Sequence, residues 1–325
     1  MAIGNKTSEI AKRFRNSHDA SWNTYARPGS NSIFNRYKTD TIFCICGQNF
    51  EPPAWQISVH KRATVQSSTG PAGAIIMRNL KSAPNVSIDG ELAYNLAIEA
   101  LGAGRETSAR NLANSYEARV ETLFVTIGRT TTGNAVLRAV KNQAGRTMDV
   151  IPAIQYSPDK APNAHASAHN DKDAGRRRKG SSTTIVYSPS DWDRPDFDLP
   201  GFHEGFSGPG SEADEVLLHE VFHALRAMAG LQVRRNVPFQ RGYDTFEEFF
   251  AILVANIYRS ESKRYGQRVD HHSFKSLDDV SIDNVYVWLD YRLNRSHLRK
   301  LRRQMPDLWA ELETVKAEFN PIALL

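Results

Sequence analysis

The pattern of apolar and polar positions changes character along the chain. Before about residue 40, aromatic residues are scattered among Asn, Ser, Arg and Gly without a regular period, which indicates a loosely ordered leader. Between residues 39 and 85, short apolar runs such as T-I-F-C-I-C and W-Q-I-S-V-H alternate with Pro, Gly and Ser, as is typical of β-strands. Helical spacing begins at about Asp89. We therefore expect two parts: residues 1–85, a leader with a small β-rich region, and residues 86–325, a mainly helical domain.

The second part is expected to combine helices with a small sheet, which makes the fold class α+β. Apolar residues at helical spacing predict helices over 91–101, 108–124, 133–141, 212–229, 246–260, 282–293 and 298–318. Two strands are expected, at 149–156 and at 184–188. Residues 157–183 between them are rich in Pro, Asn, Asp, Gly and Ser, which predicts a long loop. The C-terminal half is therefore mostly helical.

The composition is that of an ordinary soluble globular protein. Of the 325 residues, 40% are hydrophobic and 24% are charged, which excludes collagen-like, coiled-coil and wholly disordered chains. The formal net charge of +5 is mildly basic and does not by itself indicate nucleic-acid binding. The basic cluster Arg176–Lys179 lies in the predicted loop, where a solvated surface is the ordinary interpretation. A nucleic-acid patch and a loop beside a substrate groove are the alternatives.

Neither a membrane span nor a disulfide framework is expected. The longest apolar run, Phe249–Ile257, has the length of a core helix and is too short to cross a bilayer. The first residues lack the apolar segment of a signal peptide, so we expect synthesis in the cytoplasm and, if the protein leaves the cell, export without a cleavable signal. Cys44 and Cys46 have one residue between them in a predicted strand and are poorly placed to bridge each other.

The segment H-E-V-F-H, from His219 to His223, carries the clearest chemistry in the chain. Residues four apart project from one face of a helix, so both imidazoles can reach one Zn2+ at about 2.0–2.1 Å. Glu220 points roughly 100° round the helix from the first histidine, where a carboxylate can hold a water molecule and accept its proton. The pattern therefore predicts a zinc-dependent peptidase with two histidine ligands and Glu220 as general base.

A catalytic zinc site needs a third protein ligand. Glu247 and Glu248 lie near the start of an apolar helix, and both qualify by position. Ala251 and Ala255 would let that helix approach the first one closely. Glu248 could instead form a capping box with Thr245. Spacing alone leaves the choice between the two glutamates open.

A resemblance to known metallopeptidases narrows that choice. H-E-x-x-H followed after about two dozen residues by E-x-x-A resembles the gluzincin pattern. Glu248, with Ala251 three positions later, matches it, whereas Glu247 does not. The resemblance implies a zincin-like domain over residues 86–325, with Glu248 as the third zinc ligand.

The two zinc segments, with D-H-H-S-F and the terminal F-N-P-I, are similar to bacterial effector metallopeptidases. These are the NleD-like type III effector proteases and related toxin domains of type VI secretion systems. The similarity runs from about residue 124 to the end and is sharp only around the zinc segments. It implies a secreted effector or toxin that cleaves proteins in a target cell. The implied partners are a protein or peptide substrate and a cognate immunity or secretion-apparatus protein.

The oxyanion of peptide hydrolysis needs a hydrogen-bond donor besides zinc. Tyr243, just before the helix of the third ligand, is the first candidate, because related zincins carry a tyrosine in that region. His271 and His272 are the second choice. Three further histidines are expected in loops: His165, His169 and His203.

Other functions stay open beside the effector endopeptidase. A zinc amidase or peptidase acting on cell-wall peptide would use the same chemistry. A non-catalytic module could hold zinc for structure, although it would not need Glu220. A nucleic-acid binder fits only the basic cluster. For a peptidase, strand 184–188 is expected to be the sheet edge along which an extended substrate lies, and residues 157–183 a mobile loop that gates the groove.

Overall fold

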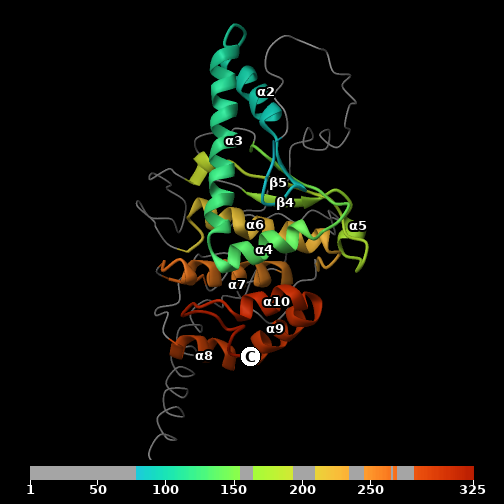
Figure 1. Cartoon of the computed structure of the whole chain (residues 1–325), viewed down its shortest axis with the longest axis vertical. Coiled ribbons are helices and arrows are strands. Elements are labelled where there is room, and N and C mark those ends of the chain that lie inside the picture. The colour runs from blue at the N-terminus through green and yellow to red at the C-terminus, as the bar shows by residue number, and fades with distance from the viewer. Residues whose placement is uncertain (1–77, 154–163, 193–208, 234–244, 265, 269–281) are drawn as a thin grey trace, which may run out of the picture. The chain divides into compact units, whose positions relative to one another are not determined.

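The protein structure, a computed structural model, describes residues 78–153, 164–192, 209–233, 245–264, 266–268 and 282–325 (Figure 1). All of them belong to one of the two units into which the chain divides. They combine helices with a small sheet, in agreement with the predicted class α+β. The predicted leader lies outside the described residues, as do Cys44 and Cys46.

The sheet has five strands in the order β1-β2-β3-β5-β4. The strands are β1 (Arg78–Asn79), β2 (Val86–Ile88), β3 (Met148–Ile151), β4 (His165–Ala168) and β5 (Thr183–Val186). The three inner strands are parallel, and β1 and β4 pair antiparallel at the two ends. In β3 and β5 every second residue is buried, which is the period of a sheet with one face on the core. The predicted domain boundary after residue 85 falls between β1 and β2, which pair with each other.

Two helices, α6 (Ala213–Met228) and α7 (Phe246–Glu261), lie in the middle of the described fold. The helices are α2 (Gly90–Leu101), α3 (Glu106–Gly128), α4 (Thr131–Lys141), α5 (Asp171–Ala174), α6 (Ala213–Met228), α7 (Phe246–Glu261), α8 (Ile282–Asp290), α9 (Arg292–Gln304) and α10 (Pro306–Glu313). Helix α6 packs against β4 and β5 on one side and against α7 on the other (Figure 1). Figure 1 also shows α8, α9 and α10 beyond α7. None of the described helices is long and apolar enough to span a membrane.

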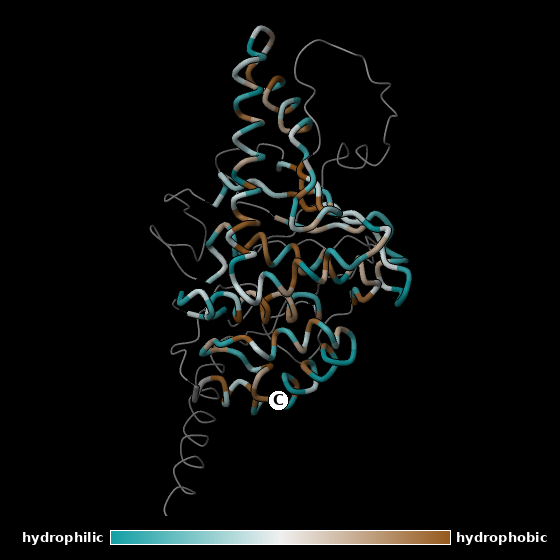
Figure 2. The backbone as a smooth tube through the Cα atoms, in the orientation of Figure 1, coloured by the Kyte–Doolittle hydropathy of each residue, from teal (hydrophilic) through white to brown (hydrophobic). Residues whose placement is uncertain are grey.

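Helices α6 and α7 are buried almost all round, because both are enclosed by other elements. Every residue from Asp214 to Met228 of α6 is buried, as is every residue from Glu247 to Ser260 of α7. Figure 2 shows hydrophobic positions concentrated along these central helices and the adjoining strands. Charged side chains inside such a core must be paired or serve a function, because burying an isolated charge is costly.

Buried ion pairs join the two ends of α6 to α7. Arg226, near the end of α6, binds Glu247, at the start of α7, with N–O distances of 2.7 and 3.0 Å. Glu215, at the start of α6, binds Arg259, near the end of α7, at 2.6 Å. This pairing requires the helices to run antiparallel. It also places acidic residues at the helix starts and basic residues at the helix ends, which the helix dipoles favour.

The prediction of a long loop over residues 157–183 is wrong for the part that the structure describes. That part contains β4 and the short helix α5. The sequence H-A-S-A of β4 lacks the β-branched and aromatic residues that usually indicate a strand. The strand conformation of β4 therefore depends on its hydrogen-bonded pairing with β5 and not on local propensity.

The prediction of one continuous C-terminal helix over 298–318 is also wrong. The structure has two helices there, because α9 ends at Gln304 and α10 begins at Pro306. Proline has no amide hydrogen to continue a helix but fits at the first helical position. Helix α6 begins without a capping hydrogen bond from the side chain of its cap residue. The cap residue is Glu212, whose carboxylate lies 3.7 Å from Arg259 and 3.6 Å from Arg264, and the Asp214 carboxylate binds Arg264.

The Arg226–Glu247 pair generates a stability prediction. Arg226→Met leaves the Glu247 carboxylate buried without its partner, and we expect the free energy of unfolding to fall by about 3–5 kcal/mol. Denaturant unfolding of the metal-free protein measures it. The matched control is Arg138→Met, which breaks the exposed Arg138–Glu311 pair and should cost less than about 1 kcal/mol. Equal losses in the two variants would contradict the structural role of the buried pair.

Candidate metal centre

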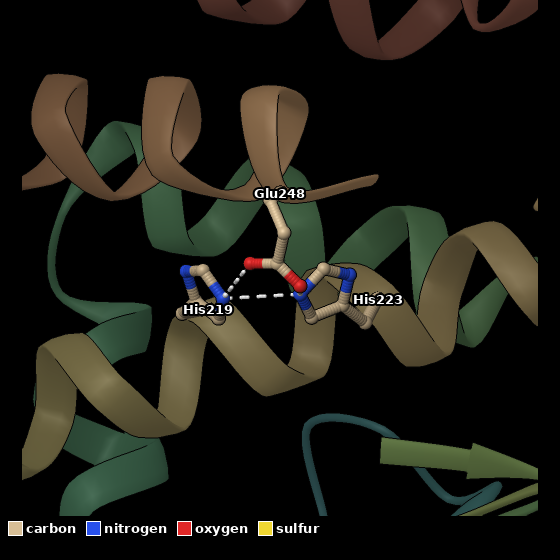
Figure 3. A group of neighbouring side chains, drawn as sticks. All are labelled: His219, His223 and Glu248. Carbon is tan, nitrogen blue, oxygen red and sulfur yellow. Dashed lines mark hydrogen bonds and ion pairs between the residues drawn. The ribbon is translucent and has the colours of Figure 1, made fainter. Parts of the chain in front are cut away.

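Helix α6 presents two histidines on one face (Figure 3). His219 and His223 are one turn apart, and their rings meet edge to face with centroids 4.7 Å apart. Their Nε2 atoms lie 3.0 Å from each other. Two ring nitrogens at this distance need a proton or a cation between them, because two lone pairs facing each other repel.

Helix α7 brings the Glu248 carboxylate over the same point (Figure 3). Its Oε2 lies 3.2 Å from His219 Nε2, and its Oε1 lies 3.4 Å from His223 Nε2. The Thr245 hydroxyl accepts the backbone N–H of Glu248 and caps the helix. The hydroxyl half of the expected capping box is thus present, while the carboxylate faces the histidines.

These three side chains could hold a metal ion. In a tetrahedral site with metal–ligand bonds of about 2.05 Å, neighbouring ligand atoms lie about 3.3 Å apart. The three distances of 3.0, 3.2 and 3.4 Å match one face of such a tetrahedron. Within the described residues no other group of three His, Cys, Asp or Glu side chains is arranged in this way.

The protonation states of His219 and His223 also favour the binding of a cation. Burial lowers the pKa of His219 despite the hydrogen bond to Glu248, so this imidazole is neutral. Burial alone would lower the pKa of His223 too, but the charge and hydrogen bond of Glu248 outweigh it and raise that pKa to about 9. The metal-free group therefore holds a proton on His223 at neutral pH, and a metal ion would take its place.

Glu220 lies beside the group and is 2% exposed. Burial raises the pKa of its carboxyl to about 8, partly offset by His223. A backbone hydrogen bond from Ala166 of β4 also lowers this pKa. Its Oε2 is buried without a hydrogen-bond partner among the described residues. A buried acid with one unsatisfied oxygen beside a metal-binding group can take up and release a proton.

The sequence interpretation missed Arg268. This buried arginine is held to α7 by Asn256, which exchanges two hydrogen bonds of 2.7 and 2.8 Å with the Arg268 backbone. Its positive charge lowers the pKa values of both His219 and Glu220. A lone arginine outside any motif carries no signal in the sequence, and only the fold brings it near the site.

The remaining candidates do not join the group in the described part of the chain. Tyr243 and the pair His271–His272 lie outside the described residues, as does His203. His165 belongs to β4, and His169, just after it, has its Nε2 atom 2.8 Å from the Thr184 hydroxyl. The prediction that these two histidines lie in loops is therefore wrong for His165.

The expected substrate edge needs a correction. Strand β5, the structural counterpart of the predicted strand 184–188, is covered by β4 and lies inside the sheet. Among the described residues β4 is the terminal strand on this side. Ala166 of β4 is also the residue whose backbone bonds Glu220. The strand that borders the candidate site is thus β4.

In comparisons with known proteins, no family model and no curated protein matches the chain. The candidate site therefore rests on its own geometry.

The pKa of His223 predicts how metal affinity depends on pH. Below about pH 9 a metal ion must displace the His223 proton, so the apparent affinity for Zn2+ should rise about tenfold per pH unit between pH 7 and 8.5. Competition with a chelator of known protonation measures it. A histidine with an ordinary pKa of about 6.5 would leave the affinity nearly constant in this range, and that result would contradict the described charge state.

The two adjacent glutamates should separate metal binding from stability. Glu248→Gln removes the carboxylate from the site, so we expect loss of bound metal with little loss of stability. Glu247→Gln should retain the metal but lower the free energy of unfolding by about 3–5 kcal/mol, because Arg226 then lacks its carboxylate. Metal loss in the Glu247 variant only would reverse the assignment.

Proposed function

We propose that the protein is a zinc-dependent metallopeptidase that hydrolyses peptide bonds in proteins. The observation that carries the proposal is the Glu220 carboxyl, which is buried beside the His219–His223–Glu248 group and has one oxygen without a hydrogen-bond partner among the described residues. A metal site that only stabilises the fold has no need of a buried acid next to it. The non-catalytic zinc module is therefore the weaker proposal.

The donor set favours zinc. Two imidazoles and one carboxylate are the ligands of many zinc hydrolases, and they leave a fourth tetrahedral position open. When bound there, Zn2+ would act as a Lewis acid on the peptide carbonyl and activate a water molecule for attack.

Glu220 would carry the protons of the reaction. Its Oε2 accepts a proton from the attacking water and then delivers it to the departing amine. In the metal-free site, burial raises the pKa of this carboxyl above its ordinary value, so it holds a proton more firmly than an exposed glutamate does. Arg268 adds positive charge near the site, and Tyr243 stays a prediction as the oxyanion donor.

Strand β4 supports a peptide as the substrate. As the terminal strand of the described sheet, it can pair with an extended peptide through backbone hydrogen bonds. Because Ala166 contacts Glu220, such a peptide would lie next to the acid. The proposal extends to a bacterial effector or toxin, as the resemblance of the zinc segments implies, with cell-wall peptide as the alternative substrate.

Replacing the general base tests the mechanism. Glu220→Gln should keep zinc and stability but lower kcat about 10²- to 10⁴-fold, because an amide cannot accept the proton. The assay follows cleavage of a tryptic peptide library by mass spectrometry. Glu212→Gln, at the start of the same helix, is the matched control and should retain activity. Near wild-type cleavage by zinc-loaded Glu220→Gln would exclude Glu220 as the base.

The compartment of action separates the two substrates. Wild type and Glu220→Gln are expressed in a bacterium, either in the cytoplasm or with an added signal for export to the periplasm. Toxicity of the wild type alone, confined to the cytoplasm, is expected for a protease of intracellular proteins. Toxicity confined to the periplasm would favour cell-wall peptide instead.

A further inference from the structure

Four consecutive basic residues, Arg176–Lys179, form an exposed turn between α5 and β5, here called the basic turn. Arg176 and Lys179 each lie 4.0 Å from the Asp173 carboxylate, at the limit of an ion pair. Arg177 and Arg178 form no ion pair with an acidic side chain among the described residues. The basic turn therefore presents excess positive charge to solvent.

The described structure fixes the basic turn to the end of α6. Just after the turn, the Ser181 N–H donates to the Ala227 carbonyl of α6 at 3.1 Å. Gly180, with φ of +64°, lies so close to Met228 that a Cβ would collide with its carbonyl oxygen. Gly230 meets the Arg176 carbonyl in the same way. These contacts hold the basic turn against the C-terminal end of α6.

Strand β4 connects the candidate site with the basic turn. Ala166 contacts Glu220, while Asn170, just after β4, donates its N–H to the Ser181 hydroxyl beside Ala227. From Glu220 to Ala227 helix α6 advances about 10 Å, at 1.5 Å per residue. An extended peptide covers that distance in about three residues. A peptide along β4 would thus reach the turn a few residues from the scissile bond.

We infer that the basic turn is a specificity subsite for acidic side chains, Asp, Glu or phosphoserine, about three to five residues from the scissile bond. The inference rests on the proposed peptidase function and adds the class of substrate. The carboxylate or phosphate would pair with the exposed Arg177 and Arg178. Exposed charges act mainly through electrostatic attraction, so the preference should weaken as salt screens it.

Stabilising the end of α6 does not explain the basic turn. Cations near a helix C-terminus interact favourably with its dipole. Arg226 already occupies that position and donates to the Leu231 carbonyl at 2.8 Å. Because Arg226 already places a positive charge at the C-terminal end of α6, the exposed arginines of the turn are not needed to stabilise that end.

The test uses the zinc-loaded full chain and the tryptic peptide library. The variant Arg177→Ser/Arg178→Asn removes two charges and keeps a residue that tolerates the positive φ of 73° at position 178. The matched control, Arg299→Ser/Arg303→Ser, removes two exposed charges from α9. Wild type and control should favour cleavage sites with Asp or Glu at the stated distance, and the turn variant should lose this preference.

Three synthetic substrates make the test quantitative. They carry Glu, Gln or phosphoserine at the preferred position. At low salt, Glu over Gln should raise kcat/KM about 3- to 10-fold for the wild type and leave it unchanged for the turn variant, at equal Tm. Phosphoserine should exceed Glu if a phosphate is preferred. Cleavage without acidic preference would overturn the subsite and leave the peptidase intact, whereas no cleavage by the wild type would overturn both.

Discussion

The antiparallel packing of α6 against α7 is the constraint on which the candidate site depends. His219 and His223 come from one helix and Glu248 from the other, so a shift of one turn would separate them by about 5.4 Å. Buried ion pairs at both ends of the helices, Arg226–Glu247 and Glu215–Arg259, hold the register. Glu247 positions the helix and Glu248 faces the histidines, so adjacent glutamates serve different purposes.

The electrostatics of the core assign different tasks to its buried acids. Glu247 and Glu215 each bind an arginine at hydrogen-bond distance, which satisfies their charge. Glu248 faces two imidazoles that a single cation can join to it. Glu220 keeps one oxygen without a partner among the described residues, and burial raises its pKa. Among these four acids, Glu220 is thus the one suited to proton transfer beside the candidate metal site.

Local spacing predicted the parts of this arrangement that lie on one helix. His219, Glu220 and His223 share a turn of α6, and their relation follows from helix geometry alone. The resemblance to gluzincins separated Glu248 from Glu247. The ion pairs were not predictable, because Arg226 meets Glu247 across 21 residues and Glu215 meets Arg259 across 44. The edge strand β4 was missed for a similar reason: H-A-S-A becomes a strand only through its pairing with β5.

The zinc K-edge X-ray absorption spectrum of the purified protein tests the account most directly. We predict one Zn2+ per chain with only nitrogen and oxygen ligands at about 2.0–2.1 Å, including the scattering pattern of two imidazoles. The double variant His219→Ala/His223→Ala should lose the metal. A sulfur ligand at about 2.3 Å, or stoichiometric zinc retained by that double variant, would contradict the assignment of the site to α6 and α7.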